Sequence, residues 1–355
     1  MTAPIQGMRT RTGKLRAERI DMSHGSGGKA MRDLIEDVFL STFDNAELAN
    51  LEDQARLDLG TLTKLGNRLA FTTDSYVIDP LFFPGGNIGS LAVNGTVNDL
   101  AVGGAIPLYL SCGMIIEEGF AVSDLRAIVT SMKIAADRAG IKIVTGDTKV
   151  VNRGAADKLF INTAGVGVIP AGVDVSAARA RPGDIVLING FVGDHGAAVV
   201  DARGDLSLES NIESDCQSLN GLVADLLANC SEVHCMRDAT RGGIASVLNE
   251  FATASGVCIK IDETALPIRP EVRAMCEILG LDPLYLANEG KLIAIVPRSH
   301  ADAALEAMRR NSLGIDSAVI GYVCESPKDT VILQTSFGGE RMVDMLIGDQ
   351  LPRIC

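Results

Sequence analysis

Residues 123–140, SDLRAIVTSMKIAADRAG, run directly into residues 141–148, IKIVTGDT, and this junction decides the fold. The first stretch carries apolar residues at helical spacing, with Ser123 as its expected N-cap and Gly140 as its expected end. The second is rich in β-branched residues and predicts a strand. A helix that leads straight into a strand indicates an α/β protein.

The same alternation extends outward from this junction. LFINTAGVGVIP (159–170) predicts another strand, and the Pro- and Gly-punctuated stretch that follows has no periodicity. IVLING (185–190) then starts a second series, so we expect two domains of α/β (α+β) type that divide after residue 170. In the second domain the pattern predicts helices at 219–229, 242–254, 270–279 and 302–309, and strands at 257–261, 292–296, 318–323 and 331–334.

Composition excludes several classes of function. The net charge is −13 and the chain has no Trp and four Tyr, which argues against a nucleic-acid partner. No stretch of about 18 apolar residues is present to span a membrane, and the N-terminal sequence lacks the apolar run of a secretory signal. We expect a cytoplasmic protein.

The eight cysteines are scattered and predict reduced core residues. Cys230, His234 and Cys235 could ligate a metal, but no fourth ligand at a suitable spacing is evident, which favours the core interpretation. Cys355 differs, because it ends the chain three residues after Pro352. A thiol in that position is either an accident or a reactive group on a movable arm.

Acidic residues follow or interrupt four apolar runs. Mg²⁺ prefers oxygen ligands and is commonly shared between carboxylates and nucleotide phosphates, so carboxylates that converge from several loops predict a metal–nucleotide site. The alternative is that each Asp caps a helix or a turn. The residues in these stretches are Asp74, Asn98, Asp99, Asp147, Thr148, Lys149, Asp238, Thr240 and Arg241.

A glycine-rich stretch, SHGSGGKA (23–30), precedes the helical pattern of residues 31–40. Backbone N–H groups at a helix N-terminus bind phosphate well, so this stretch is a candidate phosphate loop. It lacks the spacing of a Walker A motif, and a flexible linker remains the alternative. The residues concerned are His24, Gly25, Ser26, Gly27 and Gly28.

Taken together, HGSGG, TTDSYVIDPLFFPGGNIGSLAVNGTVNDLA, VTGDTKV, DVSAARARPGD, GDHG, DATRGG, NEG and the terminal PRIC resemble the HypE family of hydrogenase maturation proteins. These carbamoyl dehydratases belong to the ATP-binding superfamily of aminoimidazole ribonucleotide synthetase and selenophosphate synthetase. The resemblance covers residues 20–355 and implies a two-domain, PurM-like fold that forms a homodimer by pairing N-terminal sheets. It divides the chain into an extension (1–22), an ATP-binding, dimerising domain (23–170), a second α/β domain (171–337) and a flexible tail (338–355).

The resemblance also implies a reaction. The terminal thiol receives a carbamoyl group from a HypF-type carbamoyltransferase, and ATP drives its dehydration to a thiocyanate. The cyano group then passes to an iron-carrying HypC/HypD-type scaffold during [NiFe]-hydrogenase assembly. The alternatives are another kinase or synthetase of the superfamily, or a nucleotide-gated scaffold without chemistry; selenophosphate synthetase typically has a reactive Cys near its glycine-rich loop, whereas here the nearest is Cys112.

Roles follow from the resemblance. Cys355 is the carrier, and Lys149 and Glu289 remove protons from the carboxamide, although Lys149 could bind phosphate and Glu289 could be a turn residue. His24 and the glycines after it form a lid over the phosphates, and His195 of GDHG caps a helix rather than touching a ligand. Mg²⁺ is assigned to Asp74, Asp99, Asp147 and Asp238, and the other nucleotide contacts to Asn98, Thr148, Thr240 and Arg241.

Overall fold

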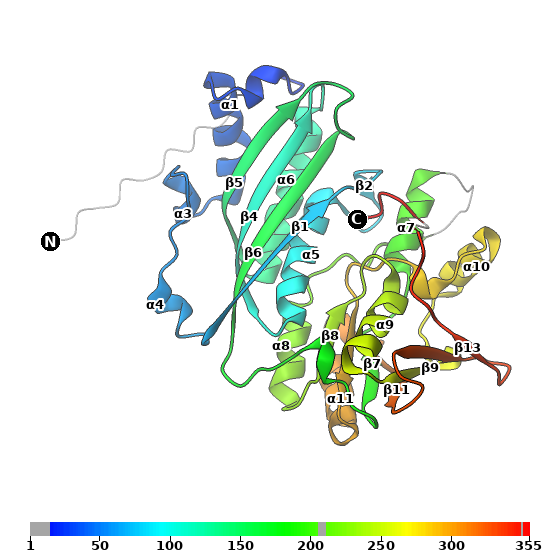
Figure 1. The fold of residues 1–355 in the computed structure, drawn as a ribbon. Coiled ribbons are helices and arrows are strands. Elements are labelled where there is room, and N and C mark those ends of the chain that lie inside the picture. The colour runs from blue at the N-terminus through cyan, green and yellow to red at the C-terminus, as the bar shows by residue number, and fades with distance from the viewer. Residues whose placement is uncertain (1–14, 205–210, 349–350) are drawn as a thin grey trace.

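The computed structural model describes residues 15–204, 211–348 and 351–355, which form two sheet-containing domains (Figure 1). The first domain is built on a four-stranded sheet. Its strands are antiparallel neighbours except for β4 and β5, which run parallel. In spatial order they are β1 (Arg68–Tyr76), β6 (Leu159–Ile169), β4 (Ile106–Glu117) and β5 (Lys142–Val151).

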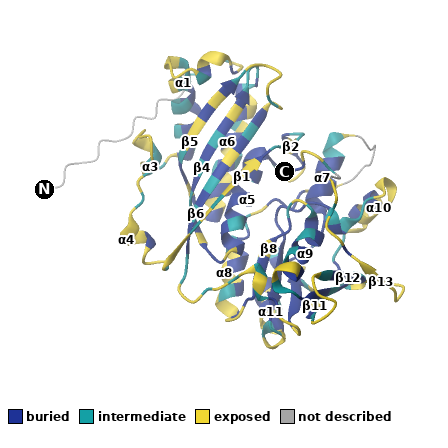
Figure 2. Cartoon of the chain, viewed as in Figure 1, coloured by how far each residue is buried: buried dark blue, intermediate teal, exposed yellow. Residues whose placement is uncertain are grey.

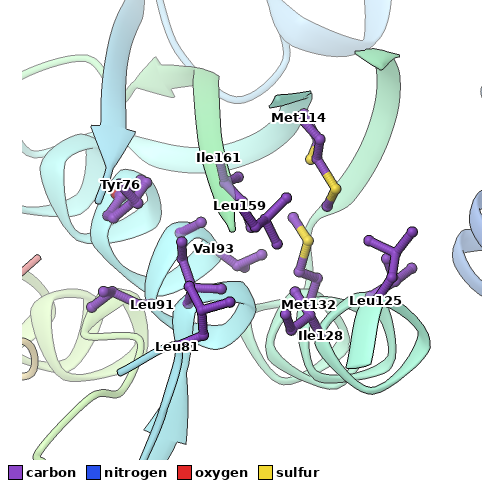
Figure 3. Close-up of a cluster of buried hydrophobic side chains, with 14 of the residues drawn as sticks. Tyr76, Leu81, Leu91, Val93, Met114, Leu125, Ile128, Met132, Leu159 and Ile161 are labelled. Carbon is purple, nitrogen blue, oxygen red and sulfur yellow. The ribbon is translucent and has the colours of Figure 1, made fainter. Parts of the chain in front are cut away.

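Two long helices, α5 (Ile88–Val102) and α6 (Val122–Ala139), accompany this sheet and share its hydrophobic core. Met114 of β4 and Met132 of α6 point toward one another in this core (Figure 3). The predicted helix and strand at the fold-deciding junction are both confirmed, and Gly140 ends the helix in the left-handed conformation at φ 71°. The N-cap prediction was wrong, because the helix begins after Ala121 and Ser123 lies inside its first turn.

The other face of this sheet is open. Phe71 is 73% exposed and Leu69 is 61% exposed, although both lie on strand β1. Ile115 of β4 is 43% exposed as well. Most residues of β1 are exposed, as the colouring of this strand in Figure 2 indicates. An apolar sheet face of this kind is typical of an interaction surface.

The N-terminal segment packs on the first domain. Residues 1–14 of the predicted extension lie outside the described residues, but Ile20 is buried and donates its N–H to the carbonyl of Phe120 at 2.8 Å. The short elements before β1 are η1 (Met22–Gly25), α1 (Lys29–Leu34), η2 (Ile35–Leu40), α2 (Ser41–Phe43), α3 (Ala46–Ala49) and α4 (Leu59–Leu62), and β2 (Phe82–Phe83) and β3 (Gly86–Asn87) follow β1.

The second domain is built on a seven-stranded sheet with helices. Five of its strands were predicted, whereas the strands Cys235–Asp238 and Glu340–Met342 were not. In spatial order its strands are β13 (Glu340–Met342), β12 (Thr330–Gln334), β9 (Cys258–Asp262), β11 (Ala318–Cys324), β7 (Ile185–Ile188), β10 (Leu292–Val296) and β8 (Cys235–Asp238). Its helical elements are η3 (Ala177–Arg179), α7 (Asp194–Arg203), α8 (Asn220–Asn229), α9 (Gly243–Ser255), η4 (Glu263–Ala265), α10 (Pro270–Leu279), η5 (Pro283–Tyr285), η6 (Arg298–His300), α11 (Ala301–Arg310) and η7 (Ser312–Gly314).

Two details bear on the sequence interpretation. β13 pairs with β12, so residues 340–342 of the tail expected from residue 338 form the edge strand of this sheet. Cys230 and Cys235 are buried and unpaired, and His234 bonds Asp184 at 2.7 Å, which agrees with the core interpretation. Within the described part of the chain, we find no helix of the length and apolarity needed to cross a membrane.

Candidate active site

The end of the chain lies where the two domains meet (Figure 1). Ile354 forms an antiparallel bridge with Ile78, just beyond strand β1, and the N–H of Asp79 donates to the carbonyl of Arg353 at 3.2 Å. Ile354 is buried in the core of the first domain, and Cys355 packs against the same core. The tail therefore rests inside the molecule in this structure.

Helix α7 of the second domain holds the tail from the other side. His195 Nε2 lies 2.8 Å from the carbonyl oxygen of Ile354, and its Nδ1 lies 2.8 Å from Ser214 Oγ. Burial lowers the pKa of His195, so the ring is neutral: Nε2–H donates to the carbonyl and Nδ1 accepts from the hydroxyl. Arg203, at the other end of α7, donates to the carbonyls of Pro352 (2.6 Å) and Arg353 (2.9 Å). The helix-cap role expected for His195 was wrong, because the ring binds the tail.

The thiol of Cys355 sits beside Arg241, in the turn that precedes α9. Arg241 Nη2 lies 3.4 Å from Cys355 Sγ and 3.3 Å from the carbonyl oxygen of the same residue. Burial and the neighbouring Glu289 raise the pKa of the thiol to about 12, and Arg241 only partly offsets them. A thiol that stays protonated is a poor nucleophile, so this position suits chemistry on a group that the sulfur already carries.

Carboxyl groups from both domains surround the tail site. Asp74 comes from β1 and Asp99 from α5, where Thr72 Oγ1 donates to Asp99 Oδ2 at 2.9 Å. Asp238 ends β8, and burial together with Asp99 raises its pKa to about 7. Burial likewise raises the pKa of Asp99, with Asp74 adding to the effect. Burial and the charges of nearby carboxylates also raise the pKa of Glu289 well above its ordinary value.

These carboxyl groups fit a divalent cation that other ligands help to hold. Among the residues that the structure describes, no three His, Cys, Asp or Glu side chains form a metal site by themselves. Asp74 nevertheless opposes the ionisation of Asp99, and both oppose the ionisation of Asp238. A cation with phosphate oxygens in its shell would relieve that repulsion.

Asn98 has a different function from the predicted nucleotide contact. It is fully buried on α5, and its Nδ2 donates to the carbonyls of Gln217 (3.1 Å) and Glu289 (3.2 Å). Its Oδ1 accepts the N–H of Leu219 at 2.7 Å. The amide is therefore fully engaged in fastening two loops of the second domain to α5, and it supports the site rather than contacting a ligand.

Asp147, Thr148 and Lys149 lie on β5, at the opposite edge of the first sheet from β1. Asp147 and Ser75 belong to the same row of paired residues across the sheet and are separated by three strand spacings. At the usual spacing between strands, their backbones are about 14 Å apart. Asp147 and Lys149 are exposed on the same open face as Ile115, whereas Thr148 is buried. Within a single chain, the structure does not bring Lys149 or Asp147 to the Cys355 site.

The glycine-rich loop lies against β5 as well. A Cβ atom on Gly25 would be 2.7 Å from the backbone nitrogen of Val150, so this close approach requires glycine. His24 is buried, and its Nδ1 accepts the N–H of Asp21 at 3.1 Å. The loop is thus near Asp147 rather than over the carboxyl groups of Asp74, Asp99 and Asp238. A cavity of about 180 Å³ runs along β5 beneath the N-terminal helices.

Sequence reasoning missed four residues that shape this site. His195 was assigned to a helix cap, and Arg203 was not singled out. Asp215, which accepts the N–H of Glu289 at 3.0 Å, and its ion-pair partner Lys291 were not singled out either. Arg203 carries no local motif, because the groups that it binds come from residues about 150 positions away. Lys291 follows NEG directly, which is the one available hint.

The comparisons first define a class of protein. The N-terminal domain of AIR synthase related protein matches residues 52–169, and its C-terminal domain matches residues 181–334. Carbamoyl dehydratase HypE of Rhodobacter capsulatus is 57% identical over 341 residues, which cover 96% of this chain and 99% of that protein. The chain belongs to the HypE carbamoyl dehydratase family.

Solved structures agree with this assignment. A crystal structure of the hydrogenase maturation protein HypE in complex with ATP has a TM-score of 0.89 and 50% identity, covering 94% of this chain and 99% of that one. HypE in a HypE–HypF complex has a TM-score of 0.76 and 49% identity, covering 88% of this chain and 99% of that one.

Proposed function

We propose that this protein uses ATP to dehydrate an S-carbamoyl group on its own Cys355 to a thiocyanate, as the cyanide source for [NiFe]-hydrogenase assembly. The observation that carries this proposal is the position of the terminal thiol. It lies inside the interdomain site, next to Arg241 and within the electrostatic reach of Glu289. A superfamily kinase acting on a free small molecule would not need a chain end in that place.

The reaction balances as a loss of water. The amide oxygen leaves as part of the phosphate that ATP supplies, and the amide nitrogen gives up two protons. The carbon that is bonded to sulfur and the nitrogen then form a nitrile. Glu289 suits the removal of protons, because burial and nearby carboxylates raise its pKa well above its ordinary value and no described group bonds its Oε1 atom. Arg241 suits the oxygen side of the carboxamide, because its guanidinium already touches the carrier residue.

ATP binding is supported by the HypE–ATP structure, and we place the nucleotide along β5. The cavity there has an apolar wall of Ile35, Phe39 and Ile143 that suits a base, and it ends at Asp147 and Thr148. The glycine-rich loop packs beside the same strand, where its backbone N–H groups suit phosphates. When bound, ATP supplies the phosphoryl group that turns the amide oxygen into a leaving group, with Mg²⁺ held by Asp74, Asp99 and Asp238.

A homodimer through the open face of the first sheet would connect these two regions. The face exposes Phe71 and Ile115 and carries Asp147 and Lys149. Burying the apolar side chains favours association, and the same contact would bring Lys149 of one chain toward a second chain. We therefore assign Lys149 a function at the partner's thiol. Phe71→Glu is expected to give monomers in sedimentation analysis, whereas Phe337→Glu, on a still more exposed turn of the second domain, is expected to leave the dimer intact.

Partners follow from the carrier function. The HypE–HypF structure supports a HypF-type carbamoyltransferase as the donor, and an iron-carrying HypC/HypD-type scaffold would accept the cyano group. All eight cysteines are unpaired, which suits a compartment that keeps thiols reduced, and we place the protein in the cytoplasm.

Intact-mass spectrometry tests the proposal directly. After exposure to the carbamoyltransferase system, a carbamoyl group should reside on Cys355, and MgATP should then remove one water from it. Cys355→Ala should abolish both changes, whereas Cys324→Ala, at the other half-buried cysteine, should change neither. A Cys355 that stays unmodified while the donor is active would overturn the proposal.

A further inference from the structure

A buried ion pair holds the loop that carries Glu289. Asp215 accepts the backbone N–H of Glu289 through Oδ1 at 3.0 Å and the N–H of Gly290 through Oδ2 at 3.1 Å. The ammonium group of Lys291 lies 3.1 Å from the same Oδ2. Asp215 is 9% exposed and Lys291 is 8% exposed, so the pair is largely removed from water.

Asp215 is itself fixed to the first domain. The N–H of Ser214 donates to the carbonyl of Pro84 at 2.9 Å, and Asn94 Nδ2 donates to the carbonyl of Cys216 at 3.3 Å. The two loops also approach so closely that a Cβ atom on Gly290 would lie 1.9 Å from the carbonyl oxygen of Asp215. Asp215 thus transmits the position of α5 and its neighbours to the Glu289 loop.

We infer that Asp215 is a positioning residue for Glu289 in the dehydration step, and that its ion pair with Lys291 holds Asp215 in place for this purpose. The inference rests on the proposed function of Glu289. Glu289 is buried and its Oε1 has no hydrogen-bond partner among the described residues, so the direction of its side chain depends on its backbone. Asp215 binds the two N–H groups that define that backbone.

The charge on Asp215 supports the same conclusion. Burial opposes its ionisation, but Lys291 and the N–H of Glu289 outweigh burial and hold the pKa of Asp215 below its ordinary value. After burial, the negative charge of Asp215 is the largest cause of the raised pKa of Glu289. A base with a raised pKa accepts protons more readily, so the pair both aims and tunes the carboxyl group.

Asp215→Asn tests the inference. Single-turnover dehydration of carbamoylated Cys355 should slow at least tenfold at neutral pH, and the acid limb of its pH profile should move down by about one unit, because a nearby negative charge is lost. Carbamoylation of Cys355 by the donor should keep its rate. The double variant Asp215→Asn/Lys291→Met removes the pair without leaving a buried unpaired ammonium group. It should slow dehydration alike and move the acid limb down by less, because the positive charge of Lys291 is lost as well.

Asp194→Asn is the matched control. Asp194 is a buried carboxyl group that lines the same cavity as Asp215 and Lys291, but it pairs with Arg269 and makes no bond to the Glu289 loop. Its variant should keep the acid limb of the wild type. The inference would be overturned if the acid limb of the pH profile were unchanged in the double variant, or if Asp194→Asn moved that limb as far as Asp215→Asn does. Full dehydration by Glu289→Gln would overturn the function of Glu289 and the inference together, whereas loss in Glu289→Gln with a normal double variant would overturn the inference alone.

Discussion

The Nε2 atom of His195 lies 2.8 Å from the carbonyl oxygen of Ile354, the residue before the terminal cysteine. A helix of the second domain thus grips the tail one residue from its reactive end. In the proposed function the thiol of Cys355 reaches a donor protein and then its own site, so this contact contributes to the balance between tail-in and tail-out positions.

His195→Leu should shift the equilibrium toward the tail-out position. The change removes a hydrogen bond worth about 1 kcal/mol and leaves the Ile354 carbonyl without its donor whenever the tail is in, so dehydration should slow about fivefold. Carbamoylation by the donor protein should keep its rate or increase, since that step uses the exposed tail. The two half-reactions can be timed separately by intact-mass spectrometry.

His234→Leu provides the control, because His234 is also buried but bonds Asp184 in the second domain, away from the tail. It should lower stability without changing the ratio of the two rates. If His195→Leu slowed both half-reactions equally, the histidine would be structural rather than a latch for the tail.

Arg203→Ala should expose the thiol. Arg203 donates to two tail carbonyls and, through Nε, to the carbonyl of Asp79 at 2.9 Å, so its loss removes a link between the tail, α7 and the first domain and weakens the tail-in position. Alkylation of Cys355 by iodoacetamide should then accelerate severalfold, because the buried thiol with a pKa of about 12 moves into water. Peptide mass spectrometry measures this rate. Arg310→Ala, which removes an exposed i,i+4 pair with Glu306, should leave it unchanged.

Mg²⁺ should bind more tightly as the pH rises through 7. Burial and Asp99 raise the pKa of Asp238 from 3.8 to about 7, so the folded protein holds a proton there that the unfolded chain releases near pH 3.8. This group therefore favours folding at acidic pH, and its contribution is lost as the pH rises toward 7. A cation must displace the proton, and calorimetry in buffers of different ionisation enthalpy should detect its release. Asp238→Asn should abolish both the release and the pH dependence; release that persists would contradict the assignment.

The second domain was predictable because its elements alternate in the usual way. Pro270 and Gly280 bracket α10 at the bounds that the sequence indicated, and the strand expected at 292–296 is β10. α5 was not predicted, because its apolar and polar residues are not separated onto two faces and the helix has no amphipathic period. Nearly all its residues are buried between the sheet and neighbouring helices. Its Gly95 fits beneath Tyr76, where a Cβ atom would lie 2.4 Å from the hydroxyl oxygen.

The candidate site was predictable only in its chemistry. Asp74, Asp99, Asp238, Glu289 and Cys355 do converge, since their motifs sit at the ends of elements that face the domain junction. Asn98 was misjudged because an Asn beside an Asp gives no sign of whether its amide faces a ligand or a loop. Residues that bind backbone carbonyls far along the chain leave no local pattern.

Lys149 and Cys355 belong to opposite edges of the first sheet, and this separation makes a prediction about the dimer. Lys149 pairs in register with Ile115 on the open face, whereas Cys355 lies beyond the end of β1, across β4 and β6. If the open faces pair, the lysine of one chain serves the thiol of the other.

Lys149→Ala and Cys355→Ala should each be inactive in dehydration, and a mixed dimer of the two should regain activity. In the mixed dimer, the Lys149→Ala chain supplies the thiol and the Cys355→Ala chain supplies the lysine, so one complete site forms. Differently tagged, co-expressed chains purified through both tags should therefore show about half of the wild-type rate. A mixed dimer of Lys149→Ala with Lys149→Ala/Cys355→Ala lacks Lys149 in both chains and should stay inactive. If the first mixed dimer were equally inactive, Lys149 would act within its own chain, and the tail would have to cross the sheet to reach it.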